Sequence, residues 1–430
     1  MSKHDGAPAP PTPTSKRKRK ERTGRAPRKP KWVRPPLPPS PERSPSPPPL
    51  PRRRAQRSRK RAAKKALAHK GIVPGVTPEQ RSHFARIAST VPTGFDTDDI
   101  RFATSGYIGV ERVEEEVKEQ RQLHTLEELV GDNSPWKFNV IPADMNNPAP
   151  TLLTDASHRV FATRIPPPAG DPTFPDQAAQ AAATLDEYRP LFFNENEAFA
   201  EHRRGNFPVK AFGVSYGGGQ EVPKMIYQSD LDLELVNRIR RMRCFNRLAG
   251  QASAAFEMWA PKLHALYMDY TDRLGKLLPN MTRNFPSSVF SCCTINFGPR
   301  TTTVEHLDHK NYIYGWCAIT ALGSFDHRLG GHLVLWDLKQ VIEFPPGWTM
   351  LIPSAYLRHS NTSLRPGDTR FSLTQYTAGG LFRVVDDEGT SRKKMKPDER
   401  RSAEQQQRDR ITEDLNCYST LEELGIDTPV

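Results

Sequence analysis

The sequence predicts an α+β protein in which supporting helices precede a sandwich or barrel of antiparallel strands, behind a disordered basic tail. Apolar residues recur at three- and four-residue steps over residues 229–277, which is typical of amphipathic helices. After Leu278 the pattern changes to short β-rich runs bounded by Pro, Gly, Asn and Asp. No helix in that region is long enough to connect parallel strands. Proline and basic residues are concentrated before residue 76.

The tail, residues 1–75, contains too little apolar surface to offset the entropy lost on ordering, so we expect it to be disordered. Its first 70 residues hold 16 of the 41 prolines and 23 of the 62 Lys and Arg, against three acids, a net charge of +20. The remaining 360 residues carry −7, which excludes a basic globule that coats nucleic acid. Basic clusters at residues 16–20 and 52–65 predict a nuclear-localisation signal or a phosphate-binding patch, with a solubilising tail as the alternative.

Localisation follows from what the sequence lacks. The apolar runs before residue 75 are two or three residues long, too short for a secretory signal, and no window of about 18 apolar residues predicts a membrane span. The five cysteines show no CxxC spacing. We therefore expect reduced thiols in a nuclear protein, or otherwise a cytoplasmic one, with no membrane partner.

The clearest helix signal begins at Ser229, which forms a capping-box pattern with Asp232. Gly250 and Pro261 are expected to end this helix, and a second helix over residues 260–277 is expected to pack beside it. The opposite face of the first helix is rich in arginine and forms either a solvated surface or a phosphate-binding track. These arginines are Arg238, Arg240, Arg241, Arg243 and Arg247.

Four runs in the next hundred residues have the composition and length of strands. They cover residues 289–297, 331–336, 348–353 and 370–376. Upstream, residues 76–205 combine one helical stretch, residues 110–129, with Pro-rich connections, and their role is left undefined.

A His-x-Asp pair, His306 and Asp308, sits just after the first of these strands. Residues i and i+2 of an extended chain point to the same side, so both side chains can converge on one ion. His359 follows 51 residues after Asp308. Two histidines and one carboxylate form the facial triad of non-haem Fe(II) oxygenases. A structural His–Asp hydrogen bond at a strand end is the alternative.

Arg370 and Ser372 raise the specificity of this pattern. Arg370 lies eleven residues past His359, after a Pro-Gly turn, and shares a strand face with Ser372. A guanidinium grips a carboxylate through two hydrogen bonds, and a neighbouring hydroxyl adds a third. This pair is equipped to bind the distal carboxylate of 2-oxoglutarate.

Several strings in residues 195–385 resemble the 2-oxoglutarate/Fe(II) dioxygenases, and more narrowly the TET/J-binding-protein-related group expanded in mushroom-forming fungi. Besides His306-Leu307-Asp308 and Arg358-His359-Ser360-Asn361, the strings are Asn296-Phe297-Gly298-Pro299, Gly330-Gly331-His332-Leu333, Phe344-Pro345-Pro346-Gly347, Thr374-Gln375-Tyr376-Thr377, His202-Arg203-Arg204-Gly205 and Gly213-Val214-Ser215-Tyr216.

This resemblance implies a double-stranded β-helix (jelly-roll) core. It implies Fe(II) held by His306, Asp308 and His359, and 2-oxoglutarate held by Arg370 with Ser372. It further implies that O₂ is consumed, that succinate and CO₂ are released, and that a ferryl intermediate oxidises the substrate. For this group the substrate is 5-methylcytosine in DNA, flipped out of the duplex, with a role in DNA demethylation.

Composition, together with the resemblance over residues 195–385, divides the chain. The segments that follow the tail are an N-terminal extension (76–205), a dioxygenase domain (206–385) with helical support (228–280) and a β-helix core (287–385), and a charged C-terminal tail (386–430).

Some assignments stay open. Asn296 and Tyr312 are candidate contacts of 2-oxoglutarate or substrate, and each is as readily structural; His332 is interpreted as a pocket or core histidine. DNA is the expected partner, through the tail and the pocket. A protein hydroxylase of the prolyl type and an inactive, transposon-derived nucleic-acid-binding module are the alternatives.

Overall fold

The computed structural model describes residues 76–111, 122–194, 197, 201–216, 220 and 222–427. The predicted disorder and basic clusters of the tail lie outside the described residues, as does half of the helical stretch expected at 110–129. Of that stretch the structure describes one short helix, α4 (Leu126–Leu129).

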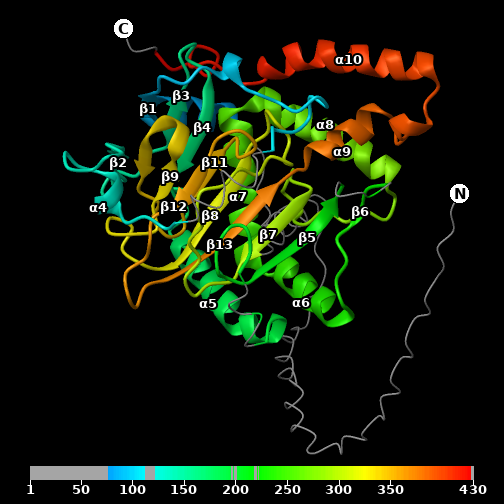
Figure 1. Ribbon diagram of the computed structural model, residues 1–430. Helices are drawn as coiled ribbons and strands as arrows, with labels where there is room; N and C mark the ends of the chain where they lie inside the picture. The colour runs from blue at the N-terminus through cyan, green and yellow to red at the C-terminus, as the bar shows by residue number, and fades with distance from the viewer. Residues whose placement is uncertain are drawn as a thin grey trace, which may run out of the picture.

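Nine strands form one mixed sheet in the order β1-β3-β4-β11-β8-β13-β7-β5-β6 (Figure 1). All neighbours are antiparallel except β1 and β3. In chain order the strands are β1 (Ser89–Pro92), β3 (Thr151–Thr154), β4 (Val160–Ile165), β5 (Val209–Ser215), β6 (Lys224–Met225), β7 (Cys292–Asn296), β8 (Cys317–Ser324), β11 (Thr349–Ile352) and β13 (Thr369–Tyr376).

A second sheet has the order β12-β9-β10-β2. Its strands are β2 (Asn139–Ile141), β9 (Leu333–Leu335), β10 (Gln340–Ile342) and β12 (His359–Asn361). Leu333 and Ile342 of this sheet belong to the same buried cluster as Met350 and Ile352 of the first sheet. The expected α+β class is therefore confirmed, with the two sheets joined through one apolar core.

All four predicted strand runs are present, as β7, β9, β11 and β13. The N-terminal extension is not a separate unit, however. β1, β3 and β4 belong to the same sheet as the strands beyond residue 290, and β2 pairs with β10. The boundary expected at residue 205 thus cuts through a continuous sheet.

Helices α5 (Phe174–Phe192) and α7 (Arg243–Trp259) cover the outer face of the nine-stranded sheet, and α6 (Asp230–Arg241) and α8 (Pro261–Leu277) pack against α7. Side chains alternate along β7 and β13. Ile295 and Leu373 pack into the cluster formed with these helices, so Asn296 and Ser372 point to the inner face.

The helix beginning at Ser229 is confirmed, because the Ser229 hydroxyl accepts from the Asp232 N–H at 3.2 Å. The break expected at Gly250 is wrong. The chain breaks at Met242, whose backbone is extended (φ −69°, ψ 136°), and Gly250 lies buried inside α7. Burial of the α7 face outweighs the cost of about 1 kcal/mol for one helical glycine.

The arginines of α6 and α7 largely serve internal contacts. Arg240 donates to backbone carbonyls of the loop after α8, Arg238 pairs with Glu234, and Arg247 pairs with Asp171 at 2.6 Å. Arg240 and Arg247 therefore hold neighbouring elements together, and Arg238 pairs within α6, which favours the structural interpretation over a phosphate track.

The C-terminal segment is also part of the body. It contains α10 (Pro397–Leu415), after which Tyr418 and Leu421 are buried. The Val160 N–H donates to the Ser419 carbonyl at 2.8 Å, so residues after α10 pack against β4. The expected charged tail from residue 386 is thus wrong over residues 397–427.

The remaining helical elements are α2 (Pro78–Ile87), η1 (Thr97–Asp99), η2 (Trp336–Leu338), α9 (Gly379–Asp386) and η3 (Arg392–Lys394). Within the described ranges no helix has the length and apolar character needed to cross a bilayer.

Candidate metal centre and carboxylate site

The structure brings His306, Asp308 and His359 together. One ligand atom from each residue lies within 4.8 Å of the others. None of the three residues is more than 8% exposed. His306 lies in an isolated antiparallel bridge opposite His359, the first residue of β12, so backbone pairing sets the ring positions. The predicted convergence is therefore present.

The two imidazoles are oriented through Nδ1. His306 Nδ1 lies 2.8 Å from the Val304 carbonyl oxygen and His359 Nδ1 lies 2.9 Å from the Leu357 carbonyl oxygen. A carbonyl oxygen only accepts, so both Nδ1 atoms carry the proton and donate. The lone pair of each ring is left on Nε2, the arrangement that a metal-ligating histidine needs. Burial lowers the pKa of both rings, which keeps them neutral.

Asp308 supplies the anionic donor. Burial alone would raise the pKa of its carboxyl, but the guanidiniums of Arg204 and Arg203 hold that pKa well below its usual range. Arg203 and Arg204 donate to the same atom, Oδ1, at 3.1 and 2.5 Å. Among the described hydrogen bonds none ends on Oδ2. Two neutral Nε2 atoms and one carboxylate oxygen fit an Fe(II) facial triad.

Arg370 is a buried cation that faces no anion in the described part of the chain. The residue is 1% exposed, Nη1 donates to the Thr301 carbonyl at 2.8 Å, and Nε has no hydrogen-bond partner among the described residues. No carboxylate among the described residues pairs with it. Burial lowers the pKa of its guanidinium to about 10. An uncompensated buried charge is costly, so the environment of Arg370 fits a carboxylate-bearing ligand.

Ser372 and Asn296 stand opposite each other on β13 and β7. The Asn296 Nδ2 donates to the Ser372 Oγ at 2.7 Å. Because this oxygen accepts from Asn296, the Ser372 O–H is left to donate to a ligand. Asn296 thus acts through Ser372, and its own Oδ1 has no partner in the described part of the chain.

His332 is a residue whose position the sequence did not resolve. It is fully buried, its Nδ1 lies 2.8 Å from the Thr362 hydroxyl, and its Nε2 has no partner in the described residues. Burial lowers its pKa to about 4, so the ring is neutral. The preceding Gly331 lies against Arg370, since a Cβ added there would be 3.2 Å from the Arg370 Cδ. In the sequence, the Gly330-Gly331-His332 string was the signal that could have placed His332 near Arg370.

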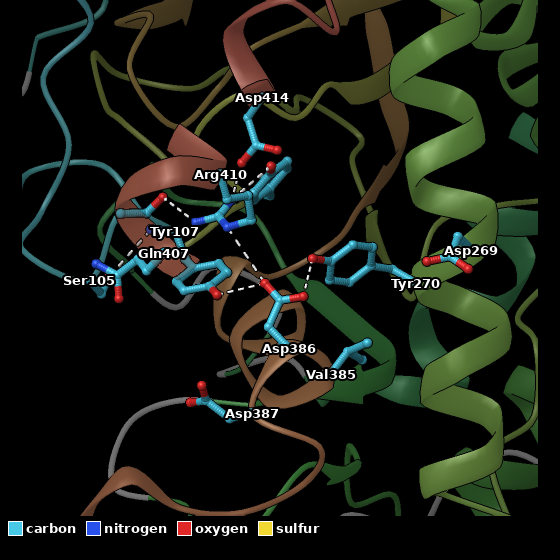
Figure 2. A network of polar contacts seen from close by, with 12 residues as sticks. Ser105, Tyr107, Asp269, Tyr270, Val385, Asp386, Asp387, Gln407, Arg410 and Asp414 are labelled. Carbon is cyan, nitrogen blue, oxygen red and sulfur yellow. Dashed lines mark hydrogen bonds and ion pairs between the residues drawn. The ribbon is translucent and has the colours of Figure 1, made fainter. Parts of the chain in front are cut away.

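Tyr312 lies in a different network. Its ring stacks on Phe382 with centroids 3.9 Å apart, and its hydroxyl lies 3.2 Å from the Arg410 guanidinium. Figure 2 shows Arg410 between Asp414 and Asp386, where it anchors α10. The described hydrogen bonds and ring contacts of Tyr312 do not join it to Arg370, so the structure does not bring this candidate to the carboxylate site.

Comparison with known proteins gives distant structural likeness only. No protein-family model and no curated protein matches the chain. The solved structures include NgTET1 in complex with 5mC DNA, at 11% identity and a TM-score of 0.39, covering 63% of this chain and 92% of that one. They also include an oxidoreductase of the 2OG-Fe(II) oxygenase family from Burkholderia pseudomallei, at 16% identity and a TM-score of 0.26, covering 50% and 83%. Likeness at this level carries no functional argument.

Proposed function

We propose that the protein is an Fe(II)/2-oxoglutarate-dependent dioxygenase. One observation carries the proposal: a buried two-histidine, one-carboxylate donor set occurs with a buried guanidinium, Arg370, that has no carboxylate partner among the described residues. The triad alone suits several metal-dependent reactions. The additional buried cation selects a reaction with a carboxylate co-substrate.

The strand order supports the jelly-roll part of this proposal. The segment β11-β8-β13-β7 alternates strands that are not consecutive in the chain, as Greek-key connections do, whereas β9 and β10 form a hairpin to which β12 returns on the other side. His306 adds a bridge at the β12 edge.

Each residue has a defined task. The Nε2 atoms of His306 and His359 and the Oδ2 of Asp308 would hold the metal, and Arg370 with the Ser372 hydroxyl would hold the distal carboxylate of 2-oxoglutarate. When bound, Fe(II), 2-oxoglutarate and O₂ supply the oxidation of a C–H bond. Because these side chains are buried, the site excludes bulk water from that chemistry.

We further propose 5-methylcytosine in nuclear DNA as the substrate. The basic clusters of the tail supply sequence-independent attraction to phosphates. Arg203, whose side chain is 51% exposed beside Asp308, places a cation at the site. Burial lowers the pKa of His309, Glu111 at 3.4 Å from its Nε2 opposes this, and Arg203 and Lys310 add to it, so basic side chains lie near the site beside one acid.

The test is a reaction of the full-length protein with Fe(II), 2-oxoglutarate and a methylated duplex, read by mass spectrometry of the nucleosides, with D308A as the inactive control. Hydroxymethylcytosine together with succinate supports the proposal. Succinate release with unchanged DNA would reject the DNA substrate while retaining the dioxygenase. A 16 Da increase on a Pro-rich tail peptide would favour the protein hydroxylase, and absence of succinate would reject the enzyme.

A further inference from the structure

The His202–Gly205 turn is fixed next to the metal centre. The His202 and Gly205 backbones exchange two hydrogen bonds of 3.0 Å, and the His202 ring caps the turn from both of its nitrogens. Its Nδ1 accepts from the Arg204 N–H at 3.2 Å, and its Nε2 donates to the Phe207 carbonyl at 2.9 Å. The side chains of Arg203 and Arg204 therefore extend from a rigid turn rather than from a free loop.

This turn is tied to the segment that bears the triad. The Val304 N–H donates to the Arg204 carbonyl at 3.0 Å, and the Val304 carbonyl in turn orients His306. Gly205 has φ +143°, and a Cβ added there would lie 2.9 Å from the Thr302 carbonyl oxygen. Only glycine allows this approach. The backbone of Arg204 is thus held in a set position relative to the metal ligands.

The two guanidiniums contact the same oxygen of Asp308 but differ in surroundings. Arg204 is the less exposed, with 27% of its side chain accessible against 51% for Arg203. Arg204 makes the shorter contact to Oδ1, 2.5 Å against 3.1 Å. Arg203 divides its donors between Oδ1 and the Leu307 carbonyl.

We infer that Arg204 is a positioning residue that fixes Asp308 as a one-oxygen metal ligand. By holding Oδ1, Arg204 prevents the carboxylate from rotating or from offering both oxygens. Two-oxygen ligation would occupy one of the three positions that a facial triad leaves open, and the co-substrate and O₂ need those positions. The inference rests on the proposed function only in requiring a divalent metal at the triad.

The test measures metal binding without turnover. Full-length protein is titrated with Co(II) in the absence of 2-oxoglutarate, and the dissociation constant and the visible absorption spectrum of the bound ion are recorded. R204M is expected to bind Co(II) about 10- to 100-fold more weakly, the range typical when a partner of a metal ligand is lost. Its spectrum should change, because the number or geometry of the oxygen ligands changes.

R203M is the matched comparison, since Arg203 contacts the same oxygen. Because Arg203 is more exposed and shares its donors with the Leu307 carbonyl, R203M should weaken Co(II) binding less than R204M does and change the spectrum less. If R203M and R204M have equal effects, or if R204M keeps the wild-type constant and spectrum, then Arg204 is only a counter-charge and the inference is overturned.

Two results separate this inference from the proposed function. A wild-type protein that binds no Co(II) would reject the metal site itself, whereas wild-type binding with an unaffected R204M rejects only the role of Arg204. Circular dichroism checks that R204M is folded. If it is not, R204K takes its place, because lysine keeps the charge without the planar fork, and the altered spectrum remains the expected result.

Discussion

His306 and His359 are paired directly across an antiparallel bridge, each backbone N–H donating to the other's carbonyl at 3.1 Å. The bridge sets their ring centroids 4.2 Å apart, although 53 residues separate them in the chain. The candidate metal centre is therefore built on backbone pairing, and each candidate ligand can be tested singly.

Loss of one candidate ligand should weaken metal retention strongly. H359A leaves one histidine and one carboxylate, too few to hold Fe(II) firmly. We expect the Co(II) dissociation constant, measured by titration, to rise at least about 10-fold, and we expect no succinate formation. H309A is the control, because His309 lies next to Asp308 in sequence but outside the ligand group. Equal metal binding by H359A and wild type would argue against the site.

Arg370 should control affinity for 2-oxoglutarate. Charge-assisted hydrogen bonds contribute about 1.5–3 kcal/mol each, so R370M is expected to weaken 2-oxoglutarate binding by about 10- to 100-fold. Isothermal titration of the Co(II)-loaded protein measures this. R300M is the control, since Arg300 donates to the carbonyls of Leu364 and Arg365 at the surface. An unchanged dissociation constant of R370M for 2-oxoglutarate would argue against a carboxylate site at Arg370.

Asn296 and Ser372 should behave as one unit. If Asn296 acts by orienting the Ser372 hydroxyl, N296A weakens 2-oxoglutarate binding less than S372A does, and the double variant resembles S372A alone. Titration of all three variants with 2-oxoglutarate gives the coupling free energy between Asn296 and Ser372. Strictly additive losses would mean that Asn296 binds the ligand independently.

His332 should make the fold sensitive to acid. Its pKa is about 4 in the folded protein, against 6.5 as the ordinary value, so the unfolded state binds the proton first as the pH falls. Its contribution to stability is complete above pH 6.5 and is lost as the pH falls toward 4, by about 3 kcal/mol in total. H332Q should lose less stability than wild type between pH 7.5 and 4.5 in urea unfolding. Parallel losses in the two proteins would contradict this.

Tyr312 should matter for stability and not for the co-substrate. Y312F removes the hydroxyl that lies beside Arg410 and should lower the free energy of unfolding by about 1 kcal/mol. The dissociation constant for 2-oxoglutarate should stay within twofold of wild type. A large loss of affinity would instead support the contact that the sequence suggested.

The sequence predicted the strands, and the approach of the His306 and Asp308 side chains, because both depend on local composition and spacing. Short β-rich runs bounded by turn residues placed β7, β9, β11 and β13, and the His-x-Asp spacing put two candidate ligands on one side of the chain. The pairing of β4 with β11 was not predictable in the same way, since it joins residues about 185 positions apart through backbone groups that every residue carries.

Other misses have the same origin. The contact of Arg204 with Asp308 spans 104 residues, and a single sequence gives no measure of that distance. The break at Met242 was missed because tertiary packing, not a local helix breaker, decides where α6 ends. Gly250 is a breaker by propensity and is overridden by burial in α7.

The place of β4 beside β11 has a practical consequence. A polypeptide started at residue 206 would lack β1, β3 and β4 and leave the β11 edge with unsatisfied N–H and C=O groups. Such an edge recruits strands from other molecules, and the product would aggregate. A truncated polypeptide for recombinant production should therefore retain β1, β3 and β4 and also the segment around Leu421.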